Sequence, residues 1–371
     1  MFFRILVFIL ALSTYSFSYA SNIDETNVKN IIDSANKNNV KAQILLGAMY
    51  EFGKGVKQDY YKAVEYYAKA AERSLGVMYE FGKGVKQNYY KAVEYYTKAA
   101  EQRDARGQCS LGVMYEFGKG VKQDYYKAVE YYTKAAEQDD ARGQFYLGYM
   151  YVKGKGVRQD YHKAVEWFTK SANHGFAEAQ YNLGIMYDNG YGVRQDYHKA
   201  VKYYTKAAEQ GNVEAQVDLG SMYYKGQGVK QDYHKAIELF TKAANQGEAK
   251  AQYNLGVMYK YGRGVKQDYH KAVEYYTKAA NQGNAQAQLN LGAMYDKGEG
   301  VKQDFHKSFE WFTKAANQGD AKAQYNLGIM YSKGQGVRQD YHKAKDFFGK
   351  ACDNGLQKGC DYYRMLNESG I

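Results

Sequence analysis

Six histidines occupy one position of a repeating pattern and are the first candidates for metal chemistry. They are His162, His198, His234, His270, His306 and His342. Ligands of one metal ion lie about 2 Å from it, whereas residues on neighbouring packed helices are on the order of 10 Å apart. Earlier copies of the pattern carry Tyr61, Tyr90 and Tyr126 at this position. We therefore predict exposed side chains in the first turn of a helix, with no metal site and no cofactor.

One pair of residues could supply a nucleophile and its base. Ser34 and Lys37 match the S-x-x-K motif of β-lactam-hydrolysing enzymes, but the companion motifs S-D-N and K-T-G do not occur. Glycine pairs such as Gly53-Lys54-Gly55 recur, but they never extend into a phosphate-binding fingerprint. We predict no catalytic residues and a protein that is not an enzyme, and keep a β-lactam-hydrolysing or -binding protein as an alternative.

A repeat in the sequence determines which elements must position any site. The marker Leu-Gly-x-Met-Tyr begins at Leu46, Leu75, Leu111, Leu147, Leu183, Leu219, Leu255, Leu291 and Leu327. Successive markers are 36 residues apart, except that the first step is 29 residues. A period in this range is typical of stacked arrays, in which a single unit cannot bury its apolar face alone.

Each copy encodes two helices, as the stretch from Ala177 to Gly211 illustrates. Apolar residues at helical spacing form one stripe in its second half: Tyr197, Ala200, Val201, Tyr204, Ala207 and Ala208. Asp196 is expected to cap this helix at its start and Gly211 to end it. A shorter first helix contains Gly184, which we expect to permit close helix packing. The sequence therefore predicts an all-α fold, an α-solenoid of helix–loop–helix repeats that forms a curved superhelix.

The repeated run A-x-x-x-L-G-x-M-Y-x-x-G-x-G-V-x-x-D-x-x-K-A resembles the Sel1-like repeat, a relative of the tetratricopeptide repeat. The resemblance extends over roughly residues 40 to 366. It implies a superhelix that mediates protein–protein contacts. Some cysteine-rich relatives are labelled β-lactamases, which is a second reason to keep the enzymatic alternative.

The chain divides into four expected parts. Residues 1–20 are predicted to be a signal peptide, with Arg4, an apolar run and a small-x-small cleavage site that ends at Ala20. Residues 21–40 resemble a capping half-repeat, and residues 41–350 are the repeat array. Near residues 72–74 seven residues are missing, so the helices there should fuse or the stack should be distorted. Residues 351–371 are the expected C-terminal cap.

The cysteines fit this division. Cys352 and Cys360 should face each other across the last turn of the array. Their C-x7-C spacing resembles the disulfide of secreted cysteine-rich Sel1-like proteins, and this resemblance implies that a disulfide holds the C-terminal cap. Cys109 is left unpaired and is expected to be a small buried residue. The predicted location is periplasmic or secreted, with no integral membrane span.

The net charge of +11 is spread over the repeats, because lysine and glutamate alternate in every copy. An exported chain without a basic cluster is not expected to bind nucleic acid. Contact with anionic envelope material is compatible with the charge.

The favoured binding site is the groove formed by the first helices. Alignment with tetratricopeptide repeats places one polar residue per copy in this groove: Asn182, Asp218, Asn254, Asn290 and Asn326. Beside them lie residues that vary between copies, namely Phe145, Tyr181, Tyr253 and Tyr325. Asparagine amides can donate and accept, which suits the backbone of an extended peptide. We predict a scaffold that binds a protein or peptide partner through its concave face, in the cell envelope or in host interaction. Cell-wall or anionic polysaccharide binding is a further alternative.

Overall fold

The computed structural model describes residues 25–371, in which every regular element is an α-helix. The chain forms two compact units, Met1–Phe176 and Ala177–Ile371, and each is described by itself. The predicted signal peptide lies outside the described residues. Within them, no helix is long and apolar enough to span a bilayer.

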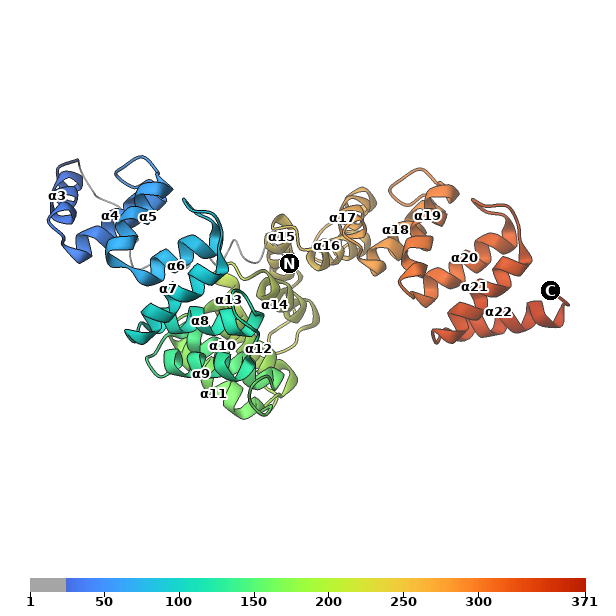
Figure 1. Cartoon of the computed structure of the whole chain (residues 1–371). Coiled ribbons are helices and arrows are strands. Elements are labelled where there is room, and N and C mark those ends of the chain that lie inside the picture. Colours follow the sequence, from blue (N-terminus) through green and yellow to red (C-terminus); the bar gives the residue numbers. More distant parts are fainter. Residues whose placement is uncertain (1–24) are drawn as a thin grey trace. The chain divides into compact units, whose positions relative to one another are not determined.

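Helices alternate between two roles along the chain (Figure 1). The first helices of the repeats are α4 (Val40–Phe52), α6 (Glu72–Phe81), α8 (Ala105–Phe117), α10 (Ala141–Lys153), α12 (Ala177–Asn189), α14 (Val213–Lys225), α16 (Ala249–Tyr261), α18 (Ala285–Lys297) and α20 (Ala321–Lys333), followed by the terminal α22 (Gln357–Glu368). The second helices are α5 (Tyr60–Ala70), α7 (Tyr89–Glu101), α9 (Tyr125–Ala136), α11 (Tyr161–Asn173), α13 (Tyr197–Glu209), α15 (Tyr233–Asn245), α17 (Tyr269–Asn281), α19 (Phe305–Asn317) and α21 (Tyr341–Asp353), preceded by α3 (Glu25–Asn36).

The packing of these helices is that of an α-solenoid. Within each unit, a first helix packs against the second helix of its own repeat and against the second helix that precedes it. The predicted all-α solenoid of helix–loop–helix repeats is therefore confirmed.

The glycine inside each first helix is required by packing. A Cβ atom added at Gly184 would lie 2.4 Å from two ring atoms of Tyr204, a separation that real side chains do not adopt. Tyr204 is itself fully buried in α13. The ring therefore fills the space left by the missing side chain, which confirms that this glycine permits close helix packing.

The expected ends of the second helix are also present. The Asp196 side chain accepts a hydrogen bond of 3.0 Å from the backbone amide of Lys199 and so caps α13. Gly211 follows the helix with a φ of +88°, in the left-handed region that favours glycine. The second glycine of the loop lets successive repeats pack closely. A Cβ at Gly228 would lie 2.4 Å from the carbonyl oxygen of Tyr197 in the preceding repeat.

A buried glutamine joins each turn to the next repeat. In α14, the Nε2 atom of Gln216 donates to the Ala208 carbonyl at 3.3 Å, and its Oε1 atom accepts from Gln246 at 3.1 Å. Both polar ends of the side chain are therefore satisfied inside the stack, as buried polar groups require.

The shortened repeat retains two separate helices. Only Ala71, with φ −151° and ψ 84°, lies between α5 and α6. Its amide donates to the Tyr67 carbonyl and its own carbonyl accepts from the Leu75 amide. The helices therefore do not fuse, because one extended residue both ends α5 and starts α6.

The cysteines lie as the sequence predicts. Cys352 and Cys360 form a disulfide with a Cα–Cα distance of 4.6 Å, which links the end of α21 to the start of α22. Cys109 is free and buried in α8, and its burial raises the pKa of the thiol to about 12. A thiol in such a site is chemically inert at neutral pH.

Candidate functional site

The first helices of the second unit present one row of side chains beside the buried stripe. In α12, Ala179, Leu183 and Met186 are buried against α13, while Tyr181 and Asn182 are half-buried next to them. The same register recurs in α14, α16, α18 and α20. We call this surface the first-helix face; it comprises Tyr181, Asn182, Asp218, Lys250, Tyr253, Asn254, Asn290, Tyr325 and Asn326.

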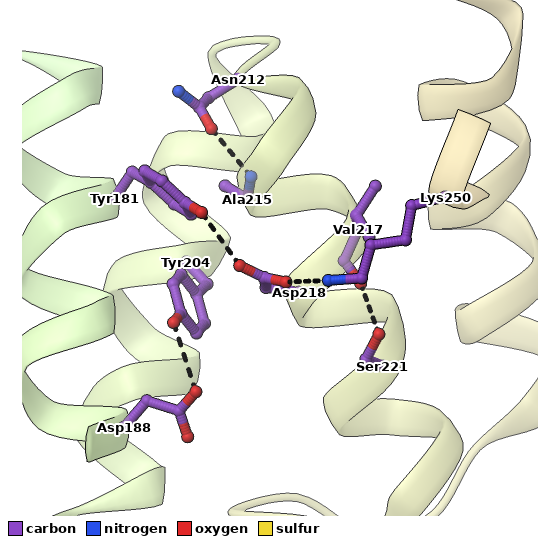
Figure 2. Close-up of polar contacts among 9 residues, drawn as sticks. All are labelled: Tyr181, Asp188, Tyr204, Asn212, Ala215, Val217, Asp218, Ser221 and Lys250. Carbon is purple, nitrogen blue, oxygen red and sulfur yellow. Dashed lines mark hydrogen bonds and ion pairs between the residues drawn. The ribbon is translucent and has the colours of Figure 1, made fainter. Parts of the chain in front are cut away.

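Asp218 connects three successive first helices (Figure 2). Its Oδ2 atom accepts a hydrogen bond of 3.0 Å from the Tyr181 hydroxyl of α12, and its Oδ1 atom pairs at 3.3 Å with the Lys250 ammonium of α16. Asp218 itself belongs to α14. The Lys250 side chain is largely exposed, so the ion pair orients the carboxylate but contributes little stability.

The charge of Asp218 also raises the pKa of a second carboxyl group, that of Asp188 in α12. The Tyr204 hydroxyl donates to Asp188 at 3.4 Å (Figure 2). Burial raises the pKa of Asp188, the hydrogen bond from Tyr204 lowers it, and the negative charge of Asp218 raises it further.

The Tyr181–Asp218 bridge has two counterparts, which lie two and four repeats further along the chain. Tyr253 of α16 forms a side-chain hydrogen bond with Asn290 of α18, and Tyr325 of α20 forms one with Tyr362 of α22. In each case the tyrosine reaches the residue 37 positions later, on the next first helix. The bridges thus occur in every second repeat.

The intervening repeats have apolar residues at the tyrosine position. Val217 and Leu289 are buried, with 2% and 9% of their surface exposed. Neither can bridge to the amide of the following helix, which belongs to Asn254 and Asn326, respectively. Both asparagines are half-buried, and no side-chain hydrogen bond satisfies either amide within residues 25–371. The alternation therefore leaves the amides of Asn254 and Asn326 without a hydrogen bond to the neighbouring first helix.

The remaining predicted residues are placed differently. The Asn182 amide donates to the Glu178 carbonyl of its own helix at 2.7 Å. Phe145 lies in the first unit, where it is buried and packs against Phe168 at 5.7 Å between ring centroids. The expectation that Phe145 presents its side chain to an open groove is therefore corrected: variation at this position follows core packing.

The residues considered for metal binding and for catalysis do not gather into a site among the described residues. The six repeated histidines are exposed at the second residue of their helices. Among the described residues, no three His, Cys, Asp or Glu side chains are grouped so that they could hold a metal ion. No hydrogen bond joins Ser34 to the Lys37 side chain in the described part of α3 and its turn.

Comparison with known proteins identifies the repeats. The model of the Sel1 repeat matches residues 40–74, 71–104, 105–140, 141–176, 177–212, 213–248, 249–284, 285–320 and 321–356. The chain belongs to the Sel1 repeat family. Scaffolds built from Sel1 repeats are typically non-catalytic and mediate protein–protein interactions.

Two solved Sel1-type structures are similar to this Sel1 repeat protein over nearly its whole length. One is a protective antigen present in uropathogenic Escherichia coli strains that displays an SLR fold: identity is 30%, the TM-score is 0.66, and 94% of this chain and 91% of that chain are covered. The other is a Sel1 repeat protein from Oxalobacter formigenes: identity is 31%, the TM-score is 0.62, and 91% and 90% are covered. Among curated proteins, none matches this chain.

Sequence reasoning missed Lys250 and the alternation of bridges. The residue at the position of Lys250 differs between repeats, so no repeated pattern in the sequence marks this lysine as part of the face. The other repeats carry Glu178, Glu214, Gln286 and Lys322 there. The alternation was visible as a period of 72 residues in the Tyr–Val–Tyr–Leu–Tyr series at positions 181, 217, 253, 289 and 325.

Proposed function

We propose that this Sel1 repeat protein is an exported scaffold whose concave face, formed by the first helices, binds a protein or peptide partner in the cell envelope or during host interaction. The observation that supports the proposal is the pair of half-buried amides of Asn254 and Asn326, which have no hydrogen-bond partner within the described chain. Each amide offers two donors and an acceptor. Neither amide is among the fully buried polar atoms, so both reach solvent, and a bound peptide backbone could replace the water that they contact.

The spacing of the two amides indicates the form of the ligand. They lie two repeats apart, or about 20 Å when neighbouring packed helices are about 10 Å apart. An extended peptide covers that distance with about six residues. A segment of this length could therefore bond to both asparagines at once.

The bridges make the face suitable for binding. Asp218 ties α12, α14 and α16 together, and the Tyr253–Asn290 bond ties α16 to α18. A partner would thus meet side chains that already hold one another in place on the face, which reduces the entropy lost on binding.

Export is supported by the disulfide and by the signal peptide predicted for residues 1–20. Structural disulfides are typical of oxidising compartments. The mass of the protein recovered from the periplasm or the medium tests this part: it should correspond to a chain that begins at Ser21. Full-length protein confined to the cytoplasm would contradict export.

The partner is tested by cross-linking and pull-down from envelope and secreted extracts. The wild-type protein is compared with the Asn254→Ala/Asn326→Ala double variant and with a control, His234→Ala/His306→Ala, which changes exposed residues of the second helices. We expect a partner that is captured by the wild type and the control but lost by the asparagine variant at unchanged melting temperature. A partner retained by the asparagine variant would place binding elsewhere on the scaffold.

A further inference from the structure

In several repeats, the residue between the two loop glycines reaches back and pairs with a charge of the preceding repeat. The partner is the penultimate residue of the preceding first helix. The pairs are Lys83 with Glu51 at 3.1 Å, Lys119 with Glu80 at 3.9 Å and, with the signs exchanged, Glu299 with Lys260 at 3.8 Å. The fold therefore brings this loop position and that helix end together in repeat after repeat.

Arg263 occupies the same loop position but meets no carboxylate. The penultimate residue of the preceding first helix, α14, is Tyr224, and the guanidinium carbon of Arg263 lies 5.3 Å from the centre of its ring. The ring of Tyr261, the last residue of α16, lies 5.5 Å from the same carbon. The Arg263 side chain has no ion pair or hydrogen bond to any residue between 25 and 371. Two tyrosine rings thus contact this cation in a place where other repeats supply a counter-ion.

This tyrosine clamp, formed by Tyr224 and Tyr261 around Arg263, is open to solvent. Arg263 is exposed, and Tyr261 exposes 58% of its surface. Tyr224 is half-buried, and its ring packs edge-on against Tyr233 at 5.4 Å between ring centroids. Contacts with aromatic rings restrict the arginine without using its five N–H donors. The guanidinium therefore remains able to bind both oxygens of a carboxylate.

The carboxylates around the clamp already have other partners. Glu299, in the next loop, lies 3.8 Å from the Lys260 ammonium and 3.9 Å from that of Lys297. Asp232 and Asp268 end the two adjoining loops, and their side chains cap α15 and α17. None of these groups forms an ion pair with Arg263.

The clamp adjoins the amide of Asn254. Asn254 and Tyr261 lie seven residues apart on α16, which places them on one face of the helix and about 10 Å apart along its axis. Arg263 contacts α14, which precedes α16 in the stack, whereas Asn326 belongs to α20, which follows it. A peptide bound to Asn326 and Asn254 would therefore reach Arg263 if it continued for about three more residues.

We infer that Arg263 binds the carboxylate of an acidic residue in the peptide partner, about three residues beyond the one that bonds to Asn254. This carboxylate would be the counter-ion that Glu51 and Glu80 supply within the first unit. The inference rests on the proposed peptide binding and adds the side chain that the peptide should carry.

The test follows the side-chain Nε–Hε signals of the purified protein by NMR after labelling its arginines with a nitrogen isotope. The probe is N-acetylglutamate methylamide, and N-acetylglutamine methylamide is the uncharged control. Arg338 is the internal control, because it is an exposed arginine with no ion pair or ring contact within the described chain. Arg263→Lys and Arg338→Lys assign the two signals. We expect the glutamate probe to bind at Arg263 at least about threefold more tightly than at Arg338, since the clamp holds the guanidinium in place.

Removal of one ring tests the clamp itself. Tyr261→Ala should weaken binding of the glutamate probe at Arg263 by about threefold. Tyr126→Ala removes an exposed tyrosine of the other unit and should leave the affinity unchanged. Thermal melting checks that both variants remain folded.

Three results would overturn the inference. They are an equal response of Arg263 and Arg338 to the glutamate probe, an equal response of Arg263 to the glutamine probe, and an affinity that Tyr261→Ala leaves unchanged. If inorganic phosphate showed a larger preference for Arg263 over Arg338 than the glutamate probe does, the assignment to a carboxylate would be wrong. None of these measurements involves Asn254 or Asn326, so their failure leaves partner capture through those amides unaffected.

Discussion

The buried Oε1 atom of Gln144 has no hydrogen-bond partner among residues 25–371, because His174 stands where other repeats place a residue that reaches it. In those repeats the donor 30 residues later is a glutamine or asparagine; Gln246, for example, donates to Gln216 at 3.1 Å. The backbone of His174, with φ −81° and ψ 6°, is nearly that of Gln210 at −84° and 5°. The position therefore has the geometry of the missing donor but not its side chain.

We predict that His174→Gln stabilises the protein. The glutamine amide would satisfy the Gln144 oxygen, for a gain of about 1 kcal/mol in the free energy of unfolding. Urea denaturation measures it. His174→Ala is the control, since it removes the imidazole without adding a donor. An unchanged or lower stability of His174→Gln would show that the Gln144 oxygen is satisfied in another way.

Gly184→Ala should destabilise the protein. The added methyl group would overlap the buried ring of Tyr204, and overpacking of this kind costs about 1–3 kcal/mol. The melting temperature gives the size of the effect. In a Tyr204→Leu background the same substitution should cost much less, because the ring that it meets is gone. Equal costs in the two backgrounds would contradict this packing relationship.

Ala71→Ser should stabilise the junction between α5 and α6. Ala71 has nearly the φ and ψ of the Asp196 cap, −151° and 84° against −151° and 96°, but it makes no side-chain cap to α6. A serine hydroxyl at such a position contributes about 1 kcal/mol. The midpoint of urea unfolding should rise, whereas Ala71→Val, which has no acceptor, should not raise it.

The pH dependence of stability should contain a contribution from Glu116. Burial raises the pKa of this carboxyl, and the hydrogen bond from Tyr132 at 2.7 Å opposes the rise only in part. The unfolded value is about 4.3. Above it the folded state holds the proton more strongly than the unfolded state, so the free energy of unfolding falls as pH rises toward the folded pKa.

Glu116→Gln removes this contribution. The melting temperature of the variant minus that of the wild type should therefore increase as the pH is raised from about 4 to 7. Glu130→Gln, which removes an exposed carboxylate of the same repeat, controls for the change in net charge. A difference that decreases with pH would mean that ionised Glu116 stabilises the folded state.

The fold was predictable because the residues that form the helices, the helix caps and the glycine turns recur at equivalent positions in nearly every repeat. Asp196, Gly184 and Gly211 act as their positions indicate, and Cys352 and Cys360 pair as the resemblance implies. Contacts between repeats were harder to predict. Tyr253 bonds to a residue 37 positions later, and nothing in the local pattern of α16 specifies that register.

The junction at Ala71 and the burial of the Arg142 Nη2 atom, which has no hydrogen-bond partner among the described residues, were also not predictable from the sequence. Deleting seven residues is compatible with fusion or distortion, and only the backbone angles of Ala71 show that the two helices remain separate. Arg142 occupies the same position as the exposed Arg106 of the preceding repeat, so the sequence alone does not show that its Nη2 atom is buried.

In the second half of the chain, the pattern of bridges repeats every two hairpins and not every hairpin. The effect of losing or gaining repeats therefore depends on whether their number is odd or even. If recombination removed residues 217–252, Tyr181 would precede Asn254 by one repeat and could occupy the amide that Val217 leaves open. Loss of 72 residues would keep the alternation in register, because tyrosine and apolar residues would still follow one another in turn at this position. Under the proposed function, a change of repeat number by an odd step would alter which asparagines can bind a partner, while a change by an even step would alter only the number of bridges.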